Sequence, residues 1–513
     1  MTATPALTVP LPRWVSLHPA AEALCAGQLV LPPAGGPSSP RLVSLADALA
    51  ATNRRWGNPV DDELQRWLAG ADAVVTGQQP GVWGGPQLTL HKAAAVAAEV
   101  RQRRAAGRDA VGFLWLATGD DDLAEMGWGR VVLGGEIVEV REEEWRRGGG
   151  LGGVATLGEA AARTLGAAGG APGSLVSAEV LELARHCYRP GHALGEATGE
   201  FLARLLAGLG VVVVDALEAE VARAAAPAVA NVLERLTEAW DALADGGQAM
   251  AARDWPVPLD LDRRRLPLYR RRDGHREHLA ADGAGCPAEV LTELRLDPAC
   301  FLPNVWLRSL VQDAALGSAV VLLGGAELAY HFQAAGVWEL ASVARPQWRL
   351  RPHVTVLTGS ERRLAVQLGL EPADLLPARL PHRLIGGRGT RRALTRLRSS
   401  LDGHLTKLDE AVAGELPGLR GDVDATRKRL LSGVDWLADR AEKAATRAAE
   451  VDVQRWEKLR MFVRPLDRPQ ERVLSALAPL LRLGLDWPRQ LAAVLDPADP
   501  GMHLLFWGEG GAW

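Results

Sequence analysis

Cysteine is scarce in this sequence. Only four occur in 513 residues, at Cys25, Cys187, Cys286 and Cys300, with no CxxC pair and no histidine at the spacing of a metal finger. This scarcity argues against a disulfide framework and against a zinc ribbon. We therefore expect no metal centre.

Long apolar runs and an excess of one charge are absent too. No segment approaches the roughly 20 apolar residues of a membrane-spanning helix, and the N-terminus lacks the pattern of a signal peptide. The 58 Lys and Arg residues nearly balance 62 Asp and Glu residues, so the formal net charge is −4. Without a global basic field, neither nucleic acid nor membrane is an expected partner. We expect a cytoplasmic protein that binds small molecules.

Lysine is rare among the basic residues. There are five, and four of them lie in one helical stretch at positions 407, 428, 443 and 458. Lys92 is the remaining one. In a chain whose usual cation is arginine, an isolated lysine suggests a position that needs a compact ammonium with three donors.

Short apolar segments alternate with helical ones along most of the chain. Five such segments are ADAVVTG from residue 71, then 112–118, 210–216, 318–325 and 353–359. Apolar residues throughout are typical of strands buried on both faces. The alternation predicts an α/β fold with a parallel sheet, in which ligands bind at the carboxyl ends of the strands.

A heptad pattern replaces this alternation after about residue 390. Apolar residues recur at Leu430, Val434, Leu437, Ala441, Ala444, Ala448 and Val451, and earlier at Leu394, Leu397, Leu401, Leu405 and Leu408. Pro417-Gly418 separates the two runs. The pattern predicts an antiparallel helical hairpin whose alanine-rich seam is weak in apolar bulk, so we expect it to form a homodimer.

The length suggests two to four folding units. We expect an N-terminal segment (1–70), a core (71–390) with insertions near 140–200 and 245–300, a helical coiled coil (391–465) and a C-terminal segment (466–513) that packs on the core.

The segment VVTGQQPGVWGGPQLTLHK, residues 74–92, joins a predicted strand to a predicted helix. Its glycines and prolines force a close loop, which can bring backbone N–H groups to an anion at the start of the helix. Thr89 and Lys92 lie on the first turns and can face one cleft. Alternatively, Gly84-Gly85-Pro86 only builds a tight helix start, and Lys92 lies along the surface.

Carboxylates follow the second predicted strand, at Asp120, Asp121, Asp122 and Glu125. Three consecutive carboxylates repel one another unless a cation, an amine or hydroxyls offset their charge. This favours a substrate-binding role. Alternatively, one aspartate caps the following helix and the others are solvated.

A polar stripe lies on the predicted helix before the fourth strand. Asn304, Arg308 and Gln312 are spaced i, i+4 and i+8, and Arg308 is suited to clamp a carboxylate or phosphate. A similar set follows the strand, at Glu327, Tyr330 and Gln333. The alternative for both sets is structural hydrogen bonding between helices.

These segments, with Arg351 and the closing PQERV at 469–473, resemble the bacillithiol biosynthesis cysteine-adding enzyme family over about residues 70–510. The resemblance implies a Rossmann-like core of the class I aminoacyl-tRNA synthetase type, with inserted connecting segments and an α-helical coiled-coil domain that dimerises. It also implies a ligase that joins the carboxylate of L-cysteine to the amine of glucosaminyl malate.

Many residues of this chain fall on the family's motifs. The first motif is matched by Gly77, Gln78, Gln79, Gly81, Gly85, Pro86 and Lys92, and the second by Asp120, Asp122 and Glu125. The third is matched by Asn304, Arg308, Gln312, Asp313, Gly325, Glu327, Tyr330 and Gln333, and the last by Gln470, Glu471, Arg472 and Gly484.

The chain also departs from the family pattern. Where the second motif resembles Glu-Asp-His-Asp, this chain has Gly119-Asp120-Asp121-Asp122, which removes one acid and the imidazole. Ser309 and Gly317 stand where prolines are expected. The alternative function is therefore a divergent, non-catalytic or repurposed coiled-coil dimer that binds a thiol or sugar ligand.

Amide formation from a free carboxylate is unfavourable in water, so we expect ATP to activate the acid as an acyl-adenylate or acyl-phosphate. The catalytic candidates are Lys92, which with the loop at 76–86 would bind anionic groups, and Asp120 and Asp122, which with Glu125 would hold amino or hydroxyl groups. Arg308 and Arg351 would take carboxylates. The substrate-binding candidates are Gly77, Gln78, Gln79, Glu125, Asn304, Arg308, Gln312, Glu327, Tyr330 and Arg351.

Overall fold

The computed structural model describes residues 3–36, 39–142, 145, 150–169, 177–283, 285–375 and 388–507. The chain forms two compact units. One contains residues 1–356 and 468–512, and the other contains residues 357–467. Parts of the expected domains fall outside the described residues, namely 1–2 and 37–38 of the N-terminal segment, 143–144, 146–149 and 170–176 of the first insertion, 284 of the second insertion, 376–387 of the core and 508–513 at the C-terminus.

The larger unit contains a five-stranded sheet in which every neighbouring pair is parallel. Its strand order is β11 (Gln347–Leu350), β10 (Ser318–Leu323), β2 (Asp72–Gln78), β3 (Ala110–Leu116) and β6 (Val211–Asp215). All five predicted segments form strands, and four of them lie in this sheet. The fifth, His353–Thr358, forms β12 of a different sheet, so its expected place in the parallel sheet was wrong and β11 takes the edge position.

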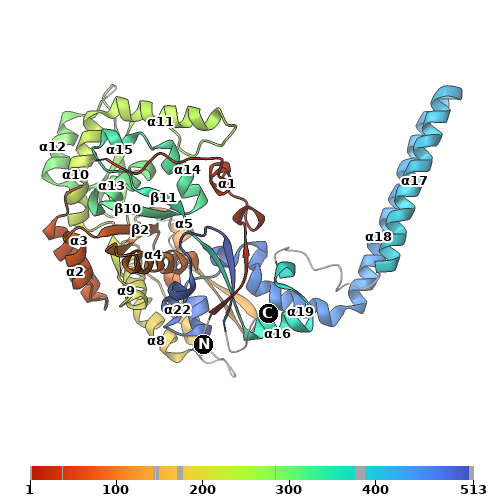
Figure 1. The fold of residues 1–513 in the computed structure, drawn as a ribbon, viewed down its shortest axis with the longest axis horizontal. Helices are drawn as coiled ribbons and strands as arrows, with labels where there is room; N and C mark the ends of the chain where they lie inside the picture. Colours follow the sequence, from red (N-terminus) through yellow and green to blue (C-terminus); the bar gives the residue numbers. More distant parts are fainter. Residues whose placement is uncertain are drawn as a thin grey trace. The chain divides into compact units, whose positions relative to one another are not determined.

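Both faces of the parallel sheet are covered by helices (Figure 1). Successive side chains of a strand point to opposite faces, so Val74 and Leu114 pack on one side while Val75 and Phe113 pack on the other. The first side is covered by α4 (Leu88–Ala105), α9 (Leu194–Leu206) and α22 (Trp487–Val494). The second is covered by α2 (Val43–Arg55), α3 (Asp61–Leu68), α10 (Ala219–Glu234) and α13 (Val305–Leu316).

The insertions add small antiparallel elements and helices to this core. A hairpin of β4 (Trp128–Leu133) and β5 (Glu136–Arg141) follows the short helix α5 (Leu123–Met126), and α8 (Ala178–Cys187) then leads to α9. The polar stretch after residue 254 contains β7 (Arg265–Arg272) and β8 (His275–Ala280), which form a second small sheet with β9 (Phe301–Pro303).

A further three-stranded sheet brings distant parts of the sequence together. Its order is β1 (Ala3–Val9), β13 (Met502–Trp507) and β12. Strand β1, near the start of the chain, thus pairs antiparallel with β13, near its end.

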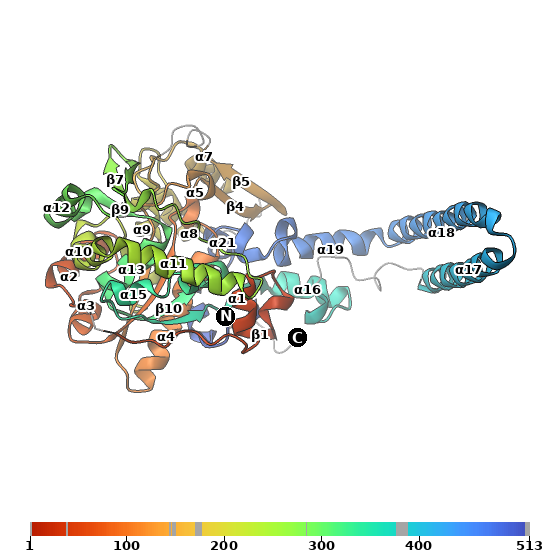
Figure 2. The same cartoon turned by 90° about the horizontal axis from the view of Figure 1, so that it is seen from above.

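The smaller unit contains the predicted helical hairpin. Helix α17 (Arg388–Glu415) and helix α18 (Arg420–Ala448) run antiparallel around Pro417-Gly418, and Figure 2 shows them side by side. Apolar side chains buried within the hairpin include Leu405 and Val434, whereas Leu397, Leu408, Leu430 and Leu437 are exposed. The unit also contains α16 (Gly359–Gln367) and α19 (Glu450–Val463). Within the part of the chain described here, no helix is both long and apolar enough to cross a bilayer.

Candidate functional site

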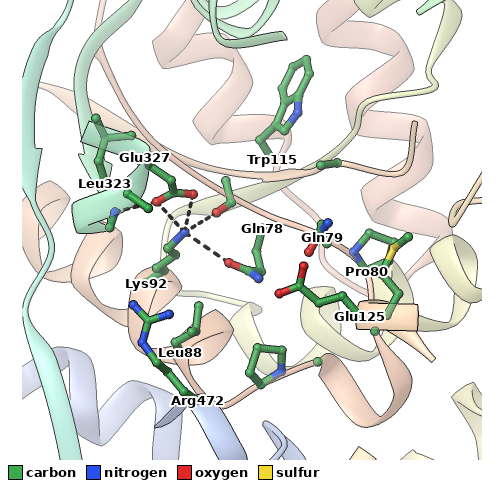
Figure 3. A pocket seen from close by; sticks show the side chains of 18 of the residues that line it. Gln78, Gln79, Pro80, Leu88, Lys92, Trp115, Glu125, Leu323, Glu327 and Arg472 are labelled. Carbon is green, nitrogen blue, oxygen red and sulfur yellow. Dashed lines mark hydrogen bonds and ion pairs between the residues drawn. The ribbon is translucent and has the colours of Figure 1, made fainter. Parts of the chain in front are cut away.

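A cavity of about 620 Å³ lies at the carboxyl ends of β2, β3 and β10, where the sequence predicts a ligand site (Figure 3). Its wall includes the loop after β2, the helix α5, the hairpin β4–β5, the helices α13 and α14 (Gly325–Gln333), and the segment around α20 (Gln470–Val473). The predicted site residues that line it are Gly77, Gln78, Gln79, Lys92, Glu125, Arg308, Gln312, Glu327, Tyr330 and Arg351.

Lys92 is buried beside this cavity, with 3% of its side chain exposed, and the alternative of a surface lysine is excluded. Its Nζ donates to both carboxylate oxygens of Glu327 (2.8 and 2.9 Å), to the carbonyl of Gly77 (2.7 Å) and to Oε1 of Gln78 (3.2 Å). Although desolvation opposes the charge, the ammonium of Lys92 lowers the pKa of Glu327. The negative charge that neutralises Lys92 is thus the carboxylate of Glu327, a residue of the protein itself.

The loop after β2 is held from the first insertion. The hydroxyl of Tyr188 accepts from the N–H of Gly84 (2.6 Å) and lies 3.2 Å from the carbonyl of Gly81, while Thr198 Oγ1 lies 3.2 Å from the N–H of Gly81. The N–H of Gly85 bonds to the carbonyl of Gly81. The N–H groups of Gly81, Gly84 and Gly85 therefore already have hydrogen-bond acceptors within the protein. This argues against the expectation that the loop binds an anion through its backbone N–H groups.

Glycine is required where this loop turns back on itself. A Cβ atom on Gly81 would lie 2.7 Å from the Cα of Gly85, which is closer than van der Waals contact. Gly84 and Gly85 have φ of 84° and 67°, and Trp83 between Val82 and Gly84 also has a left-handed conformation, with φ 57° and ψ 37°. The chain thus stores local strain beside the cavity.

The three consecutive aspartates after β3 lie in three different environments. Asp120 Oδ2 accepts from Gln79 Nε2 (2.9 Å) and Arg308 Nη1 (3.0 Å), and these partners lower its pKa against desolvation. The side chain of Asp122 caps α5 by accepting from the N–H of Glu125, as the capping alternative predicts. Neither Asp120 nor Asp122 lines the cavity itself.

Asp121, at the position of the family histidine, lies outside the cavity wall. Its Oδ1 accepts from Arg276 Nη1 at 2.9 Å, and the same guanidinium also donates to the carbonyl of Gly119. Arg276 lies on β8, in the second insertion. Asp121 therefore forms an ion pair between the acidic segment and the inserted hairpin.

Glu125 does line the cavity. Desolvation and the negative charges of Asp122 and Asp120 raise the pKa of its carboxyl group. A carboxyl group with a raised pKa is better suited to accept a proton near neutral pH than an ordinary glutamate.

Of the predicted polar residues on α13, one has a structural role and two line the cavity. Asn304 caps the helix by accepting from the N–H of Leu307 and does not line the cavity, whereas Arg308 and Gln312 do. On α14, Glu327 and Tyr330 line the cavity. Gln333 instead bonds through its side-chain amide to both backbone groups of Leu259, in the second insertion.

Behind the cavity, Glu471 forms a buried ionic cluster. Both its carboxylate oxygens accept from the guanidinium of Arg351 (2.7 and 3.0 Å), and the imidazoles of His91 and His353 lie 3.0 and 2.6 Å away. Burial lowers the pKa of both histidines, to about 4 for His353, so they are neutral near pH 7. Desolvation opposes the charge of Glu471, but Arg351 and His353 lower its pKa well below the usual value.

Four arginines on the cavity wall were not among the predicted binding residues. Arg130 and Arg141 stand on β4 and β5 and share the carboxylate of Glu139. Arg468 lies just before α20, and Arg472 lies within it. The resemblance had marked Arg472 as a motif residue, but sequence spacing gave no sign that any of the four would reach the strand ends.

The described residues contain no group of three or more His, Cys, Asp or Glu side chains placed to hold a metal ion. All four cysteines are free thiols: Cys25 is exposed, Cys187 is buried, and Cys286 and Cys300 are half-buried.

Comparison with known proteins gives two family matches. "Bacillithiol biosynthesis BshC, N-terminal Rossmann-like domain" matches residues 38–352, and "Bacillithiol biosynthesis BshC, C-terminal coiled-coil domain" matches residues 389–507. A weak likeness also exists to the structure of Mycobacterium tuberculosis methionyl-tRNA synthetase bound by methionyl-adenylate. It has 12% identity and a TM-score of 0.23, and it covers 84% of this chain and 98% of the other.

Curated relatives cover nearly the whole chain. Proteins named "Putative cysteine ligase BshC" from Koribacter versatilis and Solibacter usitatus are 25% and 26% identical to it, over 86% and 85% of this chain and 86% and 84% of theirs. The relative of that name from Thermus thermophilus is 27% identical over 87% of this chain and 91% of its own. Because the two family matches together span most of its length, this chain belongs to the BshC family of bacillithiol biosynthesis.

Proposed function

We propose that this protein is a ligase that forms an amide between the carboxylate of L-cysteine and the amine of glucosaminyl malate. The observation that carries the proposal is the polarity of the cavity. Glu125 stands near Gln79 on one side, and Arg472 stands below Lys92 on another (Figure 3). A ligand with an amine and carboxylates matches such a wall.

The reaction requires an activated acid, and we propose that ATP supplies the activation. Transfer of a phosphoryl or adenylyl group to the carboxylate of cysteine gives a mixed anhydride and releases ADP or pyrophosphate. Attack by the sugar amine then forms the C–N bond and expels phosphate or AMP. The amine must lose a proton during this attack.

Glu125 is the proposed acceptor of that proton. Its carboxyl group lines the cavity and has a raised pKa. The negative charges of Asp122 and Asp120 act on Glu125 and raise its pKa further. Lys92, paired with Glu327, orients Gln78 and the end of β2, so its contribution to catalysis is to position the cavity wall.

The direct test incubates the purified protein with L-cysteine, glucosaminyl malate and ATP and follows the amide product by mass spectrometry. We expect ATP-dependent product from the wild type. For Glu125→Gln we expect at least a tenfold loss of turnover, within the range of general-base catalysis, while glucosaminyl malate still binds. Binding of a thiol or sugar without product would favour the rival function, a non-catalytic binding protein.

We also propose that the protein is a homodimer joined through the helical hairpin. Leucine side chains on α17 and α18 are exposed, including Leu397, Leu408, Leu430 and Leu437. A row of exposed leucines on a heptad pattern is typical of a helix that packs against a second chain.

A further inference from the structure

The cations that the sequence suggested as anion binders already have carboxylate partners. Lys92 is paired with Glu327, and Arg351 with the buried Glu471. Arg308 is likewise paired, with Asp120 at 3.0 Å. A substrate carboxylate that approached any of them would have to displace a carboxylate of the protein.

Arg468 and Arg472 differ from these three. Both line the cavity and keep exposed side chains, and neither forms a hydrogen bond or an ion pair with any residue that the structure describes. Arg130 and Arg141, by contrast, both pair with Glu139. Arg468 and Arg472 are thus the cavity-wall arginines without an ion pair among the described residues.

The segment that carries these arginines is firmly anchored. Between them, Gln470 donates to the carbonyl of Val356 and accepts from its N–H, both at 2.9 Å, and Glu471 is the centre of the buried ionic cluster. Because the two middle residues are fixed in the interior, the flanking guanidiniums are presented to the cavity from a rigid base. This gives a physical role to each residue of the Gln470-Glu471-Arg472 motif.

The charges at this end of the cavity do not balance. Four cations (Lys92, Arg351, Arg468 and Arg472) stand against two carboxylates (Glu327 and Glu471), while His91 and His353 are neutral. Burial and the charges of Arg351 and Arg472 lower the pKa of Lys92, and Arg468 acts in the same way on Arg472. Arg468 and Arg472 therefore carry positive charge that no ion pair within the described residues neutralises.

We propose that Arg468 and Arg472 form a subsite for a dianionic group of the substrate. On the proposed function, which this inference presupposes, that group is the malyl moiety with its two carboxylates. Paired guanidiniums suit planar carboxylates because each can donate two parallel hydrogen bonds.

The position of Glu125 favours the malyl group over the triphosphate of ATP, the other polyanion in the proposed reaction. Glu125 lies on the same cavity wall and is close enough for the charge of Arg472 to affect its pKa. Glucosaminyl malate carries an amine for Glu125 and two carboxylates for the arginines in one molecule. ATP offers no such amine.

The test measures binding by calorimetry in the absence of turnover, with Arg468→Gln, Arg472→Gln and the double variant. We expect each single variant to bind glucosaminyl malate at least about tenfold more weakly than the wild type, because each loses a charge-assisted contact. Affinities for ATP and for L-cysteine should stay within about twofold of wild type. The control is Arg272→Gln, an exposed arginine on β7 that pairs with Glu277, which should bind all three ligands as the wild type does.

Unchanged affinity for glucosaminyl malate in the double variant overturns the subsite. A selective loss of ATP affinity also overturns it, because the arginines would then bind the nucleotide phosphates. If the wild type binds glucosaminyl malate through these arginines but forms no amide, the subsite stands and the proposed ligation fails. If the wild type does not bind glucosaminyl malate, both proposals are overturned.

Discussion

The ammonium nitrogen of Lys92, on α4, lies 2.8 and 2.9 Å from the two carboxylate oxygens of Glu327, on α14. The pair joins the helix after β2 to the helix after β10, across the ends of neighbouring strands. Glu327 also accepts from the N–H of Gly324 at 2.5 Å, so one carboxylate caps its own helix and fixes the lysine. The ion pair therefore holds together the part of the cavity wall that carries Gln78.

The first prediction tests this pair by a double-mutant cycle. Lys92→Met and Glu327→Gln should each lower the free energy of unfolding by about 2–3 kcal/mol, because each leaves an uncompensated charge in a largely buried place. The double variant should lose clearly less than the sum of the two single losses. Denaturant unfolding followed by circular dichroism measures all four proteins. Strictly additive losses would contradict the coupling of these two residues.

The sequence was informative where a residue's neighbours follow from the local pattern. The strands β2, β3, β6 and β10 are apolar along their length because both faces are covered by helices, so their composition alone indicates their position in the sheet. The helical hairpin was predictable for a similar reason, since a heptad repeat specifies its own packing partner.

Strands whose place in a sheet depends on residues far apart in the sequence could not be predicted in this way. β11 has four residues, with the polar Gln347 and Arg349 alternating with Trp348 and Leu350, so it lacks the apolar pattern of the other strands. β12 has that pattern, but its pairing with β13 depends on residues near the end of the chain.

The site residues could be predicted only in part for the same reason. Gln78 and Gln79, at the end of β2, and Arg308, on α13, line one cavity. Which cation is already neutralised there depends on carboxylates that are distant in the sequence. Arg351 is neutralised by Glu471, whereas Arg472, next to that carboxylate in sequence, has no ionic partner among the described residues.

The second prediction concerns the bonds that hold the loop after β2. Tyr188→Phe removes the phenol oxygen that binds the N–H of Gly84 and leaves this buried donor without a partner, at a cost of about 1–3 kcal/mol in stability. Because the loop carries Gln79, Pro80 and Gly81 on the cavity wall, kcat/KM for ligation should fall at least about tenfold. Steady-state kinetics and thermal melting measure the two effects.

Tyr269→Phe is the matched control for this substitution. Tyr269 lies on β7 and stacks with Arg276, away from the loop. It should keep both the melting temperature and the kinetics of the wild type. Normal kinetics in Tyr188→Phe would show that the loop keeps its shape without the phenol.

The third prediction tests the proposed dimer. Replacing Leu397 and Leu437 together with glutamate should give a monomer by light scattering, since both side chains are exposed on the hairpin and charged side chains cannot remain in an apolar interface. The helical content should be unchanged. Val366→Glu, which alters an exposed apolar residue of α16, is the control and should remain a dimer. A dimer that persists in the double variant would rule out this surface as the interface.

The last prediction concerns Asp313, a fully buried carboxyl group behind the cavity. Burial raises its pKa to about 7, although hydrogen bonds from Ser318, Trp338 and Gln312 act in the opposite direction. The indole N–H of Trp338 donates to its Oδ2 at 2.9 Å. Since an unfolded chain releases this proton near pH 4, the folded state binds the proton more tightly.

This difference makes stability fall as the pH rises from about 4 to about 7, by a total on the order of 4 kcal/mol from this group, and then remain level. Asp313→Asn keeps an oxygen acceptor for Trp338 but cannot ionise. Relative to the wild type, the variant should therefore gain about 3 kcal/mol of stability between pH 5 and pH 8. Urea unfolding at the two pH values measures the gain, with the exposed Asp486→Asn as control. If wild type and Asp313→Asn change in parallel with pH, the carboxyl group at position 313 is ionised in the folded protein at pH 5, and the burial argument fails.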